Sequence, residues 1–211
     1  MPPLGFDLEF IPGRGPVVHN PYRTMEDAEK INAVDAEKDL HFVYDAIRLI
    51  RKKLDGRVPL LGFAGGPLTV ASYIIEGGSS KELGETKKLC FNNPEAFQIL
   101  LTKITELTIN YLSLQAEAGA QTLVVMDSWA GHFSPADYQQ YIFPYTQQIF
   151  KALRAKTKVP LLHYANGASA LLPQFAEFSC DALGVDWRID IAEAIKKAPH
   201  KILQGNLDPC T

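Results

Sequence analysis

Five short apolar runs in this sequence each end in a cluster of glycine or polar residues, the residue types that bind small polar ligands. The clusters lie at residues 64–66, 127–128, 163–167, 186–187 and 205–208. Hydroxyl, amide and carboxylate groups donate or accept hydrogen bonds, and glycine lets the backbone approach a ligand closely. One such cluster often does no more than cap a helix or make a tight turn. Their recurrence after consecutive runs favours one shared pocket.

The elements that position these clusters follow from the alternation of apolar runs with helical patterns. We predict strands at residues 8–11, 58–63, 122–126, 159–163, 182–185 and 201–204. We predict helices at residues 36–54, 68–75, 94–118, 135–155, 168–178 and 189–197, and a loop-like segment at residues 5–23. Strands that alternate with helices in this way predict an α/β fold with a parallel sheet.

Two of the helix starts carry clear capping signals. Asn93 and Ser134 suit the N-cap position, and each is followed by proline, which is favoured at the first helical position. The longest helix has apolar residues spaced by three and four up to Gly119, which suits a C-terminal stop.

The number of strands leaves two architectures open. About six strands are fewer than the eight that close a (β/α)8 barrel. The residues therefore fit either an open doubly wound sheet or a part of a barrel. In both, the clusters lie at the carboxyl ends of the strands, where ligands bind in folds of this class.

The composition is that of one globular domain spanning residues 1–211. Apolar residues make up 46% of the chain and charged residues 21%, which suffices for a single core. The formal net charge of −3 argues against nucleic-acid binding through a basic surface. No apolar run is long enough to span a membrane, and no secretory signal is visible. Three widely spaced cysteines, Cys90, Cys180 and Cys210, predict reduced thiols and a cytoplasmic protein.

The common catalytic fingerprints are absent from the sequence. It has no G-x-x-x-x-G-K-[ST] phosphate loop, no H-E-x-x-H and no G-x-S-x-G. The histidines are scattered, and a lone histidine is more often a structural residue than a ligand. His163, at the expected end of a strand, is a stronger candidate than the others. Tyr138, Tyr141 and Tyr145 recur at helical spacing, which is typical of packing residues.

Longer blocks of sequence carry a more specific signal. They are FIPGRGP at 10–16, LGFAGGPLT at 61–69, SYIIEGGS at 72–79, DSWAG at 127–131, GVDW at 184–187 and QGNLDP at 204–209. In this order, over nearly the whole chain, the blocks resemble the uroporphyrinogen decarboxylase family. Any one block alone would be a weak signal, but the set is specific.

This resemblance implies a (β/α)8 barrel that forms a homodimer and needs no metal or organic cofactor. The implied partner is the tetrapyrrole uroporphyrinogen, which loses carbon dioxide from four acetate side chains to give coproporphyrinogen in heme biosynthesis. The resemblance assigns substrate binding to Tyr73 and Ser128 and the apolar pocket wall to Phe63, with Tyr164 as a further wall residue. Both hydroxyls can donate hydrogen bonds to substrate carboxylates. We therefore expect Tyr73 and Ser128 at the mouth of one cavity.

Three parts of the family pattern have no counterpart in residues 1–211. They are an arginine-rich R-Q-A-G-R segment, an aspartate soon after it, and the histidine of an N-x-G-H-G block. We therefore predict no catalytic residue within this chain. With only about six of the eight β/α units of a barrel, the chain is expected to be an internal portion of a family member that does not decarboxylate alone. Its compartment would be the cytoplasm or, in a plant or alga, a plastid.

Two alternatives stay open at this point. A zinc methyltransferase of the same superfamily, acting on corrinoid proteins or methylated amines, would use an H-x-C zinc pair. The matching place here reads His163-Tyr164-Ala165, and a single histidine cannot hold zinc in a tetrahedral protein site. The other alternative is a non-catalytic copy that serves as a binding or assembly scaffold.

Overall fold

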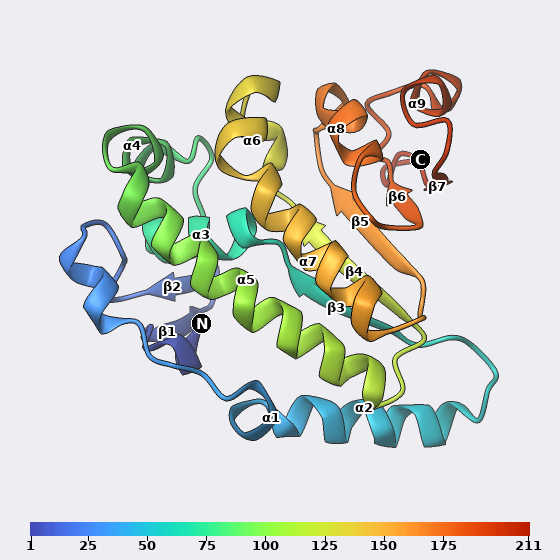
Figure 1. The fold of residues 1–211 in the computed structure, drawn as a ribbon, viewed down its shortest axis with the longest axis horizontal. Helices are drawn as coiled ribbons and strands as arrows, with labels where there is room; N and C mark the ends of the chain where they lie inside the picture. Colours follow the sequence, from blue (N-terminus) through green and yellow to red (C-terminus); the bar gives the residue numbers. More distant parts are fainter.

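The chain folds into a parallel α/β sheet with a small hairpin beside it. The computed structural model describes residues 1–211 (Figure 1). The parallel strands are β3 (Leu61–Gly65), β4 (Thr122–Asp127), β5 (Leu161–Ala165), β6 (Ala182–Gly184) and β7 (Ile202–Gln204). They pair in sequence order, from β3 to β7, and β3 and β7 remain edge strands. The sheet therefore has the β/α alternation of a barrel without being closed.

The predicted α/β class is confirmed, but the count of about six β/α units is not. Five parallel strands form the main sheet. The remaining expected strand, β1 (Leu8–Ile11), pairs antiparallel with β2 (Gly15–Val18), a strand that the sequence analysis placed in a loop. Gly13 and Gly15 both have φ of +78°. They make the tight turn here, because glycine adopts left-handed conformations at little cost.

Nine α-helices precede or alternate with the parallel strands along the chain. They are α1 (Ala36–Asp39), α2 (His41–Leu54), α3 (Pro67–Glu76), α4 (Gly84–Asn92), α5 (Pro94–Glu117), α6 (Pro135–Tyr141), α7 (Phe143–Lys156), α8 (Leu172–Ala176) and α9 (Ile191–Lys197). The two capping predictions are confirmed: Asn93 accepts the N–H of Ala96, and Ser134 accepts that of Asp137. Two predicted helices are each split in two, at Leu40 and at Ile142, and α4 was not predicted.

The core lies between the sheet and the helices α5 and α7, which cross the same side of the sheet (Figure 1). The larger of two clusters of buried apolar residues, with 41 members, includes this layer. Phe97, Leu100 and Leu101 of α5 are fully buried, as their spacing predicted. Burial of this apolar face, more than helix propensity, stabilises the long helix.

The opposite side of β3 is open. Leu61 and Phe63 are 46% and 59% exposed, whereas the alternate residues Gly62 and Ala64 are buried. The free edge of β3 is partly covered by the buried amide of Gln115, which accepts from the Phe63 N–H at 3.1 Å and donates to its carbonyl at 3.0 Å. This side-chain amide satisfies backbone groups that a neighbouring strand satisfies inside a sheet.

None of the helices combines the length and the apolar character needed to cross a lipid bilayer.

The three cysteines are free, and their environments predict different reactivity. Cys90 and Cys180 are buried, and burial raises the pKa of the Cys90 thiol to about 12 and that of Cys180 to about 11. Cys210 is exposed. Because the thiolate is the reactive form, we expect a disulfide reagent to titrate one thiol per native chain and all three after unfolding in guanidinium. Rapid native labelling of all three would contradict the buried positions.

Candidate functional site

The five polar clusters predicted from the sequence lie along one edge of the sheet. Each one is at or just beyond the carboxyl end of β3, β4, β5, β6 or β7. Because the strands are parallel, these ends lie side by side. We refer to the segments that follow the strands at this edge as the carboxyl rim.

At the first part of the carboxyl rim, Tyr73 packs against Trp129, the residue that follows Ser128. Tyr73 is on α3, and its ring packs edge-on against Trp129 with centroids 6.1 Å apart. Trp129 directly follows Ser128, so the segment after β4 lies against α3. Both Tyr73 and Ser128 are half-buried. Their hydroxyls make no hydrogen bond within the chain, whereas those of Tyr22 and Tyr44 donate to main-chain carbonyls.

The carboxylate of Asp127, the residue before Ser128, connects three elements by hydrogen bonds. Asp127 is fully buried at the end of β4. It accepts hydrogen bonds from the Tyr138 hydroxyl of α6 at 2.9 Å and from Thr69 Oγ1 of α3 at 3.3 Å. Burial, followed by the negative charge of Asp127, raises the pKa of Tyr138 well above its usual value. Tyr138 therefore stays a protonated donor. The hydrogen bonds to Asp127 hold α3 and α6, which is in the segment after β4, against the end of β4.

The segments after β4 and β5 are in direct contact. A Cβ at Gly131 would lie 2.5 Å from the carbonyl oxygen of Gly167 and 2.8 Å from that of Asn166. No side chain fits between these backbones, so glycine is required at position 131. The contact continues the carboxyl rim from Ser128 to the end of β5.

The carboxyl rim continues from β5 to β6 and β7 through Asp186. This residue is 7% exposed, and its carboxylate accepts the main-chain N–H groups of Gly167 and Arg188. The side-chain amide of Asn206, after β7, donates to the carbonyls of Asp186 and Ile189. Contacts along the carboxyl edge of the sheet therefore join all five segments.

Phe63 lies apart from the two hydroxyls. It lines an apolar cavity of about 280 Å³ at the edge of β3, whose walls include Leu4, Ile104 and Tyr111 but neither Tyr73 nor Ser128. The cavity that Phe63 lines is thus not shared with Tyr73 and Ser128, and a pocket common to all three residues stays a prediction. Tyr164, the further wall residue, is half-buried and pairs with Met126 in the sheet register, on the side away from the helices.

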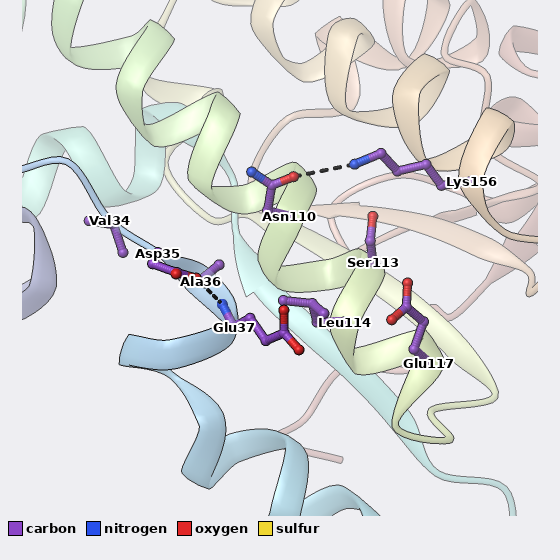
Figure 2. A pocket seen from close by; sticks show the side chains of 9 residues that line it. All are labelled: Val34, Asp35, Ala36, Glu37, Asn110, Ser113, Leu114, Glu117 and Lys156. Carbon is purple, nitrogen blue, oxygen red and sulfur yellow. Dashed lines mark hydrogen bonds between the residues drawn. The ribbon is translucent and has the colours of Figure 1, made fainter.

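A larger cavity, of about 540 Å³, lies elsewhere (Figure 2). It is bounded by the start of α1, the last turns of α5 and the end of α7, and none of the predicted site residues lines it. Lys156 reaches across to Asn110 Oδ1 at 3.3 Å, while Glu37 and Glu117 also line the space. These helices end just before β4 and β5 begin, so this cavity is at the amino-terminal side of the sheet. Ligand chemistry in barrel folds belongs to the other side.

The expectation that His163 ends a strand is wrong. Strand β5 runs to Ala165, two residues further than predicted, and this places His163 inside the strand. It is 1% exposed and faces the helix layer, against the rings of Phe175 and Phe178 at 4.5 and 4.9 Å. Neither ring nitrogen has a hydrogen-bond partner, and Nε2 is 3.9 Å from Asp127. His163 is therefore a core residue, not one that faces the carboxyl rim.

The sequence analysis missed the roles of two residues near the carboxyl rim. It assigned Tyr138 to packing alone, and it did not identify Arg188. Tyr138 packs on Phe175 at 5.5 Å, as predicted for a packing residue, but its hydroxyl also holds Asp127. Arg188 follows the GVDW block and bonds to Asn166 and Asp186. No group of three or more His, Cys, Asp or Glu side chains is placed to hold a metal ion.

The fold and the carboxyl rim define an open part of a (β/α) barrel, and comparisons with known proteins agree with that fold. A methyltransferase from Methanosarcina mazei superposes with a TM-score of 0.81 at 23% identity, covering 100% of this chain and 62% of that one. This likeness shows the fold. The family model for uroporphyrinogen decarboxylase (URO-D) matches residues 1–211, so the chain belongs to that family.

Two curated relatives place the chain within the family more closely. The uroporphyrinogen decarboxylase of Carboxydothermus hydrogenoformans is 43% identical over 98% of this chain and 59% of its own length. That of Listeria innocua serovar 6a is 44% identical over 100% of this chain and 60% of its own length. The chain thus spans about 60% of the length of the curated relatives it matches.

Proposed function

We propose that this chain supplies the tetrapyrrole-binding rim for the decarboxylation of uroporphyrinogen. In each step of that reaction an acetate side chain loses its carboxylate as carbon dioxide. The bonding electrons pass to the pyrrole ring, and a proton is added so that the side chain becomes a methyl group. A site for this reaction must fix the acetate and exclude water around it.

The observation that supports the proposal is the meeting of α3 with the segment after β4. The contact between Tyr73 and Trp129 brings the phenol close to the segment that carries Ser128. Both hydroxyls are free of intramolecular partners and half-buried, so each can donate to a carboxylate. Hydrogen bonds to charged groups are the stronger kind, and partial burial strengthens them further.

Phe63 and Met126 supply apolar surface for the rings. They are 59% and 37% exposed. Phe63 and Gly65 are two residues apart in β3 and so share a face, and the sheet register pairs Gly65 with Met126 of β4. Phe63 and Met126 therefore lie on the same side of the sheet, away from the helices. Aromatic and thioether groups pack well on flat rings. We propose this open sheet surface, bordered by the carboxyl rim, as the place where the tetrapyrrole lies.

Binding of uroporphyrin, the stable oxidised form of the substrate, tests the proposal. We expect the purified chain of 211 residues to bind it, and Tyr73→Phe or Ser128→Ala to weaken binding by about tenfold, the value of one hydrogen bond to a charged group. Quenching of tryptophan fluorescence gives the dissociation constants. Tyr145→Phe, which removes a hydroxyl from α7 in the helix layer, is the matched control and should leave binding unchanged.

Two results would overturn the proposal. One is a wild-type chain that folds but binds no uroporphyrin. The other is that the Tyr73→Phe and Ser128→Ala variants bind uroporphyrin as tightly as the Tyr145→Phe control does. In the same preparation we expect no turnover of uroporphyrinogen, because the chain has no counterpart of the family's arginine-rich, aspartate and histidine blocks. Normal turnover would refute that part.

A further inference from the structure

Arg188 is a cation held in a fixed position on the carboxyl rim, across the sheet from Tyr73. It follows β6, and its guanidinium carbon lies 3.9 Å from the centroid of the Trp187 ring. Its Nη1 donates to Asn166 Oδ1 at 2.9 Å and to Asp186 Oδ2 at 3.0 Å. We infer that Arg188 binds a carboxylate side chain of the tetrapyrrole, an inference that rests on the proposed function.

Part of the Arg188 guanidinium makes no hydrogen bond within the chain. All side-chain hydrogen bonds that Arg188 makes within the chain use Nη1. The Nε–H and the Nη2–H groups are left without a partner, and these two nitrogens form one side of the planar fork. That side can give two parallel hydrogen bonds to one carboxylate, the strongest and most directional arrangement available to arginine.

Asp186 does not neutralise this cation fully. The Asp186 carboxylate is nearly buried and accepts main-chain N–H groups from Gly167 and Arg188 as well as the side chain of Arg188. Its charge is therefore shared among three donors. Arg188, with 46% of its side chain exposed, keeps attraction for a second anion at its solvent side. The stacking on Trp187 adds rigidity, so less side-chain entropy is lost when a ligand binds.

The location also fits a large polyanion. Contacts at Gly131 and Gly167 join the segment of Ser128 to the segment of Asn166, and Asn166 in turn bonds Arg188. Hydroxyl donors therefore lie at one part of the carboxyl rim and a guanidinium at another. A flat ligand with carboxylates around its edge can contact both at once, and a ligand with a single carboxylate cannot.

The test compares Arg188→Gln with a charge-matched control. Arg48 on α2 is also exposed, by 60% of its side chain, and pairs with Asp45 at 2.9 Å, so Arg48→Gln removes the same charge far from the carboxyl rim. We expect Arg188→Gln to weaken uroporphyrin binding by about tenfold and Arg48→Gln to change it less than about twofold. Arg188→Lys keeps a cation beside Asp186 but loses the fork, and should also weaken binding.

Two outcomes separate this inference from the proposed function. If the wild-type chain binds uroporphyrin and both Arg188 variants bind equally well, the inference is overturned and the proposed function stands. If the wild-type chain binds none, both are overturned. Should Arg188→Gln fail to fold, as judged by circular dichroism, Arg188→Lys decides. Coproporphyrin, which keeps only propionates, identifies the side chain that Arg188 contacts. If Arg188→Gln weakens the binding of coproporphyrin as much as that of uroporphyrin, the contact is with a propionate. If it weakens the binding of coproporphyrin less, the contact is with an acetate.

Discussion

Replacing Phe150 by alanine is expected to lower the free energy of unfolding by about 4 kcal/mol, because large-to-small changes at buried aromatic positions leave a cavity. Phe150 is fully buried on α7. Its ring packs against Phe178 at 5.4 Å and against His163 of β5 at 5.9 Å. It therefore joins a covering helix to the middle of the sheet. Urea denaturation followed by circular dichroism measures the change.

The control for Phe150 is an exposed phenylalanine on another helix. Phe42 of α2 is 60% exposed, so Phe42→Ala removes the same atoms with little loss of buried area. We expect it to change the free energy of unfolding by less than about 0.5 kcal/mol. Equal effects of the two substitutions would mean that α7 is not packed on β5 as described.

The elements of this fold that local chemistry determines could be predicted from the sequence. The capping residues Asn93 and Ser134, each followed by proline, locate the starts of α5 and α6. Short apolar runs locate the five parallel strands. These signals are strong because a cap or a buried strand depends on residues next to one another in the chain.

The elements that depend on distant contacts could not be predicted in the same way. Strand β2 contains Pro16, and the dense prolines and glycines around it favour a loop. It forms because the hairpin packs on α3, where Val18 donates its N–H to the carbonyl of Gly77. The ends of β3 and β5 lie two residues beyond the predicted ones for a related reason: neighbouring strands extend the pairing.

The candidate site shows the same division. A parallel sheet brings the carboxyl ends of its strands together, so the clusters at Ser128 and Asp186 could be assigned to one edge from sequence alone. A residue inside a strand points to one face of the sheet, whereas a residue at the strand's carboxyl end can border the carboxyl rim. An error of two residues at the end of β5 placed His163 on the carboxyl rim, although it faces the core. Arg188 was missed because its partners, Asn166 and Asp186, become neighbours only in the folded chain.

Asp127→Ala is expected to affect stability and ligand binding together. The substitution leaves the buried hydroxyl of Tyr138 without its acceptor and opens a small void, which together lower the free energy of unfolding by about 3 kcal/mol. It also releases α3 from β4, because Thr69 loses the same acceptor. Tyr73 and Ser128 then lose their fixed separation, and uroporphyrin binding should fall by more than about tenfold. Denaturation and the fluorescence titration measure the two effects.

A double-mutant cycle isolates the buried bond from the other consequences of removing Asp127. Tyr138→Phe alone deprives the carboxylate of its hydroxyl donor at 2.9 Å and should also destabilise the chain. When both partners are absent, neither the hydroxyl nor the carboxylate of this pair is left unsatisfied, and the loss at Thr69 is common to both Asp127 variants. The double variant should therefore be more stable than the sum of the single losses predicts, by about 1 kcal/mol or more. Asp45→Ala, at a carboxylate 64% exposed, is the control and should cost less than about 0.5 kcal/mol. Additive losses in the cycle would show that the bond between Tyr138 and Asp127 does not hold α6 to β4.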